Sequence, residues 1–183
     1  MVEIPQTRKK LRETQFFFQR LHDKEMEHSL EHSEEFDFFL SAFVSSGRSV
    51  TFALQAEQKE VYDRWFPGWR NSLTEKDQHL LTFMNNQRVA EVKKKGATVH
   101  TEIELVPVTE VGARGEGHPA YGIHWFAPPG TPPLEIGKRV NYFEVGATKQ
   151  EAVTTCKRYL ELLEKLVKDF SVFITHTGPE TVS

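Results

Sequence analysis

The sequence predicts a mainly α (α+β) protein in which four helices form a bundle and a small antiparallel β-insert lies between the third and the fourth. Apolar residues recur at helical spacing in four segments, at residues 7–28, 34–57, 74–95 and 148–170. Between residues 97 and 105 the apolar period becomes two, which is typical of a half-buried strand. The 183 residues have the length of one domain, which we expect at residues 1–175, with the β-insert at about 97–146 and a flexible tail at 176–183.

The first two predicted helices differ in the width of their apolar faces. The first, residues 7–28, carries a narrow stripe that includes Leu11, Phe17 and Leu21 among charged residues. The second, residues 34–57, is apolar over a wide face, which indicates packing on more than one side. Gly47 lies in its middle, where glycine costs about 1 kcal/mol relative to alanine. We therefore expect another helix to approach closely at Gly47.

Residues 62–71 are expected to connect the second helix to the third, because Pro67 and Gly68 interrupt the helical pattern. The third helix begins near Thr74, which stands at N-cap spacing from Asp77, and it ends at Gly96. The connector is rich in large rings interleaved with arginines. We expect the rings to form a small core beneath the connector or a dimer contact, with base stacking as the alternative. The rings are Tyr62, Trp65, Phe66 and Trp69, and the arginines are Arg64 and Arg70.

The β-insert is expected to hold strands at residues 97–105, 121–126 and 139–145. The Gly-rich stretch at residues 112–119 precedes no Lys-Ser/Thr pair and opens no helix, so we interpret it as a turn rather than a phosphate-binding loop. Thr148 and Glu151 form a capping-box pattern, which predicts that the last helix begins there. Cys156 falls on the apolar stripe of this helix and is expected to be a buried, unreactive thiol.

Composition and charge exclude several classes of protein. Hydrophobic residues make up 38% and charged residues 27%, which is typical of a globular protein. The net charge of −3 argues against a basic surface over the whole molecule. A single cysteine forms no intramolecular disulfide, and no apolar run reaches the roughly 20 residues of a membrane span, so we expect a cytoplasmic protein without a membrane partner. His28 and His32 have a metal-compatible spacing without an HExxH pattern, so we interpret them as surface residues and expect no metal or cofactor.

Two segments carry a resemblance to a known family. Residues 35–57, EFDFFLSAFVSSGRSVTFALQAE, form an aromatic-rich helix with an Arg-Ser-Val step, and residues 79–96, HLLTFMNNQRVAEVKKKG, form the next helix. Together they resemble bacterial HEPN-like helical-bundle proteins, whose signature is an Arg, often followed by Asn, with a His about five positions after the Arg. Arg88 takes the place of the signature Arg, whereas Val89 stands where Asn is usual and Lys93 where the His belongs.

The resemblance implies a bundle that forms a homodimer and, where the signature is intact, a metal-independent ribonuclease whose Arg-His pairs face each other. A histidine transfers protons near neutral pH, and an arginine offers a fork of donors to a phosphate. Lysine attracts a phosphate but, with an ordinary pKa near 10.4, is a poor proton shuttle. The altered signature therefore predicts a degenerate, non-catalytic module that binds RNA, a nucleotide or a partner protein. The resemblance places such modules in bacterial defence or toxin–antitoxin systems.

Two other functions stay open at this point. An active metal-independent ribonuclease would use Arg88 and Lys93 as its catalytic residues, or a histidine brought from elsewhere, such as His28, His79 or His100. A structural or partner-binding bundle with no nucleic-acid role would instead hold Arg88 in an ion pair of the core.

The candidate ligand-binding residues lie on the second and third predicted helices. Arg88 lies on the apolar stripe of its helix, so it must be paired, either in a structural ion pair or with a ligand. Asn85, one turn earlier, is its expected hydrogen-bonding neighbour. Arg48 and Ser49 are interpreted as a polar contact inside the bundle or as support for Arg88. Lys93 is either a solvated cation at the helix end or part of a phosphate-attracting patch.

Overall fold

The computed structural model describes residues 3–27, 34–94, 99–107, 135–145 and 148–176. Within these ranges the chain is mostly helical and carries a small antiparallel sheet, as the sequence predicts. The helices are α1 (Pro5–Met26), α2 (Glu34–Glu57), α3 (Lys59–Ser72), α4 (Glu75–Lys94) and α6 (Ala152–His176), and the strands are β1 (Val99–Pro107), β2 (Glu135–Val145) and β3 (Thr148–Glu151).

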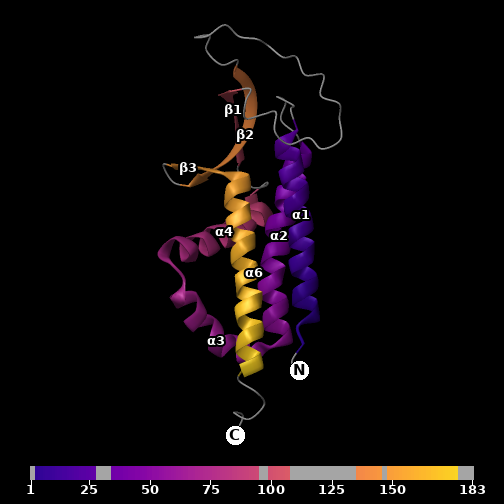
Figure 1. Ribbon diagram of the computed structural model, residues 1–183, viewed down its shortest axis with the longest axis vertical. Coiled ribbons are helices and arrows are strands. Elements are labelled where there is room, and N and C mark those ends of the chain that lie inside the picture. Colours follow the sequence, from indigo (N-terminus) through magenta and orange to yellow (C-terminus); the bar gives the residue numbers. More distant parts are fainter. Residues whose placement is uncertain (1–2, 28–33, 95–98, 108–134, 146–147, 177–183) are drawn as a thin grey trace.

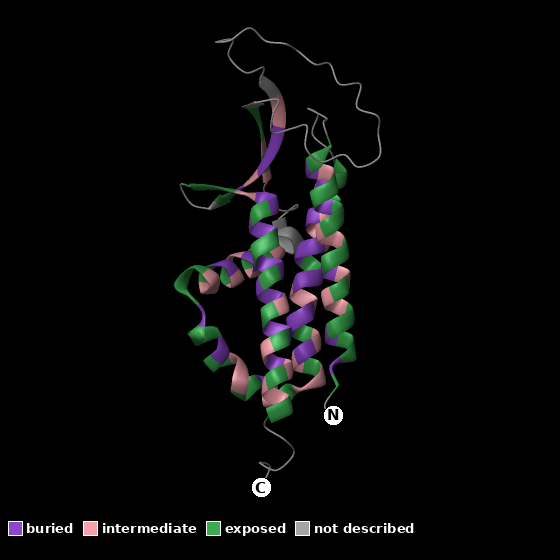
Figure 2. Ribbon diagram, in the orientation of Figure 1, coloured by how far each residue is buried: buried purple, intermediate pink, exposed green. Residues whose placement is uncertain are grey.

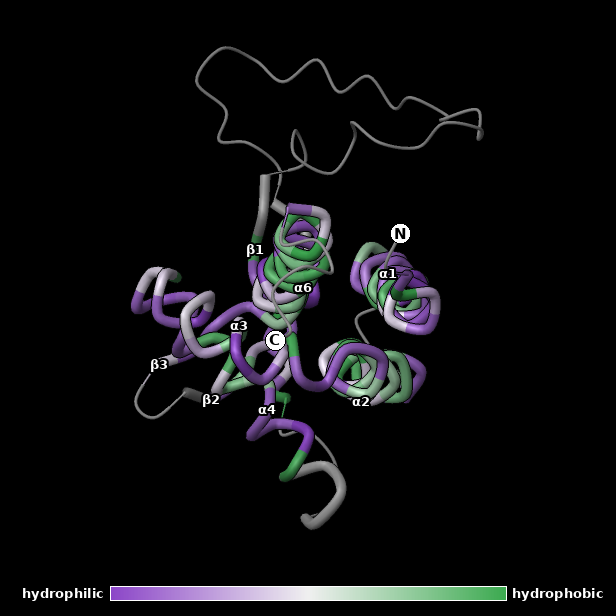
Figure 3. The backbone as a smooth tube through the Cα atoms, turned by 90° about the horizontal axis from the view of Figure 1, so that it is seen from below, coloured by the Kyte–Doolittle hydropathy of each residue, from purple (hydrophilic) through white to green (hydrophobic). Residues whose placement is uncertain are grey.

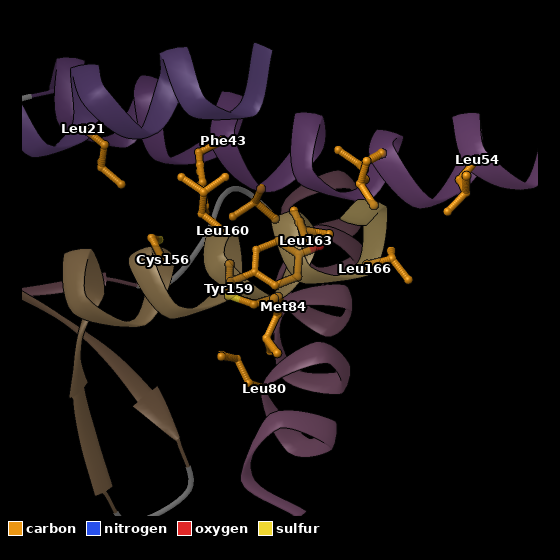
Figure 4. Packing of buried hydrophobic residues seen from close by; sticks show 14 of the residues in the cluster. Leu21, Phe43, Leu54, Leu80, Met84, Cys156, Tyr159, Leu160, Leu163 and Leu166 are labelled. Atoms are coloured by element: carbon orange, nitrogen blue, oxygen red, sulfur yellow. The ribbon is translucent and has the colours of Figure 1, made fainter. Parts of the chain in front are cut away.

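Three long helices form the body of the molecule. α1, α2 and α6 run side by side along the long axis, while α3 and α4 lie together on one side of them (Figures 1 and 3). Buried residues gather along α2 and α6, which carry the widest apolar faces (Figure 2). α6 lies between α1 and α2 on one side and α4 on the other (Figure 4). Its contribution to the core includes Cys156, Tyr159, Leu160, Leu163 and Leu166.

The predicted close approach at Gly47 is confirmed. A Cβ atom built on Gly47 would lie 2.6 Å from Cε1 of Tyr159 and 3.4 Å from Cδ1 of Leu163, both on α6. The ring of Tyr159 also packs edge-on against Phe43, one turn before Gly47. The missing side chain at Gly47 therefore lets the two central helices approach each other across an aromatic contact.

The predicted connector at residues 62–71 is wrong, because this segment is part of helix α3, which contains Pro67 in its interior. The rings on α3 outweigh the helix-breaking signal by packing against the end of α6. Trp65 stands edge-on to Phe170, and the indole N–H of Trp69 donates a hydrogen bond of 3.0 Å to Asp169. The described part of the chain thus has five helices where the sequence predicts four.

The sheet has the strand order β1-β2-β3 and lies at the end of the bundle where α6 begins (Figure 1). β1 and β2 pair antiparallel from Val99 opposite Phe143 to Pro107 opposite Glu135. β2 is attached to the C-terminal end of α1, because the carboxylate of Glu25 accepts hydrogen bonds from the backbone N–H and the side-chain amide of Asn141. The predicted strand at residues 121–126 and the Gly-rich turn lie outside the described residues.

The predicted start of the last helix at Thr148 is also wrong. Thr148 and Glu151 belong to β3, which pairs with β2, and α6 begins at Ala152. The backbone carbonyl of Glu151 accepts a hydrogen bond of 2.7 Å from the hydroxyl of Thr155. α6 ends at His176, and the rest of the predicted tail lies outside the described residues.

None of the helices that the structure describes combines the length and the apolar character needed to cross a lipid bilayer.

Candidate functional site

Two arginines from neighbouring helices meet at one aromatic ring. Cζ of Arg48, on α2, lies 4.3 Å from the ring centroid of Phe52, one turn further along the same helix. Cζ of Arg88, on α4, lies 5.8 Å from the same centroid. Phe52 itself is 46% exposed. We call these three residues the two-arginine site; it combines two cations with a ring that solvent reaches.

The guanidinium of Arg48 is only partly satisfied. Its Nη1 donates a hydrogen bond of 3.2 Å to the hydroxyl of Thr51, which in turn donates to the backbone carbonyl of Arg48. Its Nε is buried and finds no acceptor among the described residues. A buried donor without a partner costs free energy, which the hydrogen bond to Thr51 and the contact with the ring of Phe52 must offset.

Arg88 is half-buried, and its guanidinium lies over the ring of Phe52. No described carboxylate lies within 4.0 Å of its guanidinium, so the ion pair required by the structural interpretation is absent from this part of the chain. Arg48 likewise pairs with no described carboxylate. Neither arginine of the two-arginine site therefore forms an ion pair with the residues that the structure describes.

A pocket of about 260 Å³ opens beside the site, between α2 and α3. Aromatic and polar side chains from both helices line it. Among them, Asp63 is held in position by two hydrogen bonds. One carboxylate oxygen of Asp63 accepts from Nε2 of Gln55 at 2.7 Å and the other from Nζ of Lys59 at 2.5 Å. The pocket is lined by Arg48, Thr51, Phe52, Gln55, Tyr62, Asp63, Phe66 and Pro67.

Asp63 and Tyr62 are the two ionisable groups on the α3 side of this pocket, and hydrogen bonds and burial shift their pKa values. The hydrogen bonds from Lys59 and then Gln55 hold the pKa of Asp63 below its usual range, so its carboxylate is ionised at neutral pH. Burial raises the pKa of Tyr62 to about 12, against the opposing effect of Arg48, so its phenol is neutral. The pocket therefore offers a fixed carboxylate and a protonated phenol beside the arginine.

The other predicted ligand-binding residues are not brought to Arg88. The hydroxyl of Ser49 donates to the carbonyl of Ser45 in its own helix at 2.9 Å. Asn85 is half-buried on α4 and forms no hydrogen bond with Arg88 among the described residues, which corrects the expected pairing. Lys93 lies in the last turn of α4, and its side chain is outside the described residues.

The predicted histidine alternatives do not assemble a proton-transfer site in the described part of the chain. His79 is exposed and lies 3.9 Å from Glu75, one turn away on α4. His100 lies on the polar face of the sheet, 3.1 Å from Glu144. His28 and His32 fall outside the described residues, and no group of three or more metal-ligating side chains occurs within them.

The single thiol behaves as the sequence predicts. Cys156 is fully buried in the core between the helices. Burial raises its pKa well above the ordinary value for a thiol, and the nearby charge of Glu25 acts in the same direction. The thiolate, which is the reactive form, is therefore disfavoured at neutral pH.

Sequence reasoning misses Phe52 and Asp63 and therefore the pocket. One signal for Phe52 is present, because it follows Arg48 by four residues and so shares its helix face. Asp63 gives no signal while residues 62–71 are interpreted as a connector, because its position beside Gln55 depends on the helix α3.

Comparison of the chain with protein-family models, with curated proteins and with solved structures gives no match in any of the three.

Proposed function

We propose that this protein is a binding module that takes single-stranded RNA at the two-arginine site and does not cut it. One observation carries the proposal. Arg48 and Arg88, from two helices, share the exposed ring of Phe52, and neither forms an ion pair with a described carboxylate. A polymer with phosphates and flat bases supplies the two partners that such a site lacks.

The chemistry of each residue supports this ligand class. A guanidinium presents a planar fork of donors that matches the oxygens of a phosphate, and such charge-assisted hydrogen bonds are among the strongest in proteins. An exposed aromatic ring stacks on any base, which contributes about 1–3 kcal/mol per base. Single-stranded RNA fits better than a duplex because its bases are free to stack on Phe52.

The proposal that RNA is not cut rests on α4, whose one histidine does not lie beside Arg88. His79 precedes Arg88 by nine residues on α4, which places it about 180° around the helix and roughly 13 Å along it. Lys93 replaces the histidine of the HEPN signature and would need a pKa lowered by about three units to exchange protons at neutral pH. We infer a degenerate HEPN-like origin from the sequence resemblance of residues 35–57 and 79–96 alone.

The test is fluorescence polarisation with a short, labelled single-stranded RNA, using wild type, Arg48→Gln and Arg88→Gln. Each substitution removes one charge from the site, and we expect each to weaken binding about tenfold or more, because a hydrogen bond to a charged group contributes about 1.5–3 kcal/mol. Arg158→Gln is the matched control, since it removes the same charge from an exposed position on α6 that faces Asp77.

Three outcomes would contradict the proposal. Wild type without measurable affinity, or equal affinity in all four proteins, would remove the two-arginine site as the RNA contact. The same reactions are run on a denaturing gel with and without divalent ions. RNA that wild type cleaves and Arg88→Gln leaves intact would replace the proposal with the ribonuclease.

A further inference from the structure

The pocket beside the two-arginine site contains one feature that phosphate binding does not use. Asp63 lines it together with Arg48 and Phe52, and its carboxylate is ionised. A negative charge at this position repels a phosphate. The phosphate is therefore left to the arginines, and the pocket suits a neutral group with hydrogen-bond donors on its edge.

Asp63 keeps acceptor capacity that its neighbours do not fill. A carboxylate has about four acceptor positions on its two oxygens. Gln55 occupies one position on one oxygen, and Lys59 occupies one on the other. One position therefore remains on each oxygen, and the two donors, from α2 and α3, restrict the rotation of the carboxylate.

Three aromatic side chains line the pocket. Tyr62 and Phe66 stack on each other with ring centroids 4.8 Å apart and an interplanar angle of 17°, which leaves the exposed ring of Phe52 as the surface on which a base can stack. The phenol of Tyr62 is neutral at neutral pH, so Asp63 is the anion of the lining. A volume of about 260 Å³ is smaller than the typical site of a drug-sized molecule, which suits a single base rather than a longer segment.

We propose that the pocket takes a guanine base and that Asp63 reads its Watson–Crick edge. Guanine presents two adjacent donors there, N1–H and the 2-amino group, which match the two free acceptor positions of one carboxylate. Adenine and cytosine each present one amino donor beside an acceptor nitrogen, which faces the carboxylate unfavourably, and uracil presents a single N–H between two carbonyls. This inference rests on the proposed RNA binding and adds guanosine preference to it.

The experiment uses the same polarisation assay with uridine tracts that carry one central guanosine, inosine, adenosine or cytidine. We expect wild type to prefer the guanosine probe to the adenosine probe by about tenfold or more, within the range of a bidentate base contact. Inosine, which lacks the 2-amino group and keeps N1–H, should fall between them. Asp63→Asn should bring the four probes to similar affinities.

The matched control is Asp23→Asn, because Asp23 on α1 also accepts a hydrogen bond from a glutamine, Gln19, at 2.8 Å, but lies outside the pocket. It should keep the guanosine preference. If wild type binds all four probes equally, or Asp63→Asn keeps the full preference, the guanine inference is overturned while the proposed RNA binding stands. If wild type binds none of the probes, both fail.

Discussion

At Gly47 the backbone of α2 lies against the ring of Tyr159, and a methyl group there would overlap the ring at 2.6 Å. Alanine would gain about 1 kcal/mol of helix propensity, but overpacking in a core costs about 1–3 kcal/mol. Tyr159 is buried and packed against Phe43, so the ring has little room to retreat. We expect Gly47→Ala to lower the free energy of unfolding by up to about 2 kcal/mol in urea titrations.

Gly68 provides the matched control for this substitution. It also lies inside a helix, α3, but a Cβ atom built there meets nothing within 4 Å. Gly68→Ala should therefore leave the free energy of unfolding unchanged or raise it by up to about 1 kcal/mol. If Gly47→Ala proved as stable as Gly68→Ala, the close packing of α2 on α6 would be contradicted.

Glu25 makes stability depend on pH in an unusual direction for a carboxylate. Burial raises its pKa above 4.5, against the opposing hydrogen bonds from Asn141. The folded state therefore favours the protonated form, and the stability that this group contributes is fully present below its unfolded pKa. That contribution is lost as pH rises through the folded pKa, because a charge must then be held in a buried position.

Glu25→Gln removes this titration. We expect the difference in unfolding free energy between Glu25→Gln and wild type to shift in favour of the variant as pH rises from about 4 to 7. Urea titrations of both proteins across this range measure the difference, and Glu161→Gln, at an exposed position on α6, is the control. A difference that is constant with pH, or that shifts toward wild type, would show that Glu25 is not held in a buried position.

At the scale of single residues, the sequence predicts what depends on one helix face. The contact at Gly47 is confirmed because a glycine inside a helix indicates close approach, and the buried thiol of Cys156 is confirmed because helical periodicity places it on the apolar stripe. The partner of Arg88 is not predictable in this way. Its ring contact with Phe52 depends on how α4 packs against α2, which no local pattern encodes.

Among the elements, α3 shows how tertiary packing overrides a local signal. Pro67 removes one helical N–H and crowds the preceding turn, which costs about 3 kcal/mol in a helix interior. Four rings on one short helix offset this cost, because they bury surface against each other and against α6. The helix-breaking effect of Pro67 can be predicted from the sequence alone. The surface against which the rings pack forms only when α6 has folded onto α3.

This balance predicts that α3 becomes more stable when the proline is removed. Pro67→Ala restores an N–H, and the greater freedom of the unfolded chain offsets part of the gain, so we expect about 1–2 kcal/mol of stabilisation in urea titrations. Pro5→Ala is the control, because Pro5 occupies the first turn of α1, where proline is favourable. A loss of stability in Pro67→Ala would show that the helix is not continuous through this residue.

At the start of α6, the sequence contains a helix-start pattern that the structure does not use. Thr148 and Glu151 have capping-box spacing, but pairing with β2 extends the chain through both residues. Strand pairing recruits them because it satisfies backbone groups that a helix start would leave without partners. The position of a helix end next to a sheet is therefore set by the neighbouring strand.

For the whole molecule, helical periodicity predicts the class and the approximate bounds of four helices, and the period of two predicts the sheet before the last helix. The two-arginine site and its pocket are beyond such reasoning, because α2, α3 and α4 all contribute to them. The homodimer and the HEPN-like origin implied by the resemblance stay predictions. The proposed function depends on whether the guanidinium groups of Arg48 and Arg88 bind phosphates.

The salt dependence of RNA affinity tests this claim most directly. For single-stranded nucleic acid, each phosphate that a protein neutralises adds about 0.7 to the magnitude of the slope of log affinity against log salt concentration. We expect Arg88→Gln to reduce the magnitude of the wild-type slope by about 0.7, and Arg158→Gln to leave it unchanged. A slope in Arg88→Gln equal to that of wild type would mean that Arg88 binds no phosphate and would contradict RNA binding at the two-arginine site.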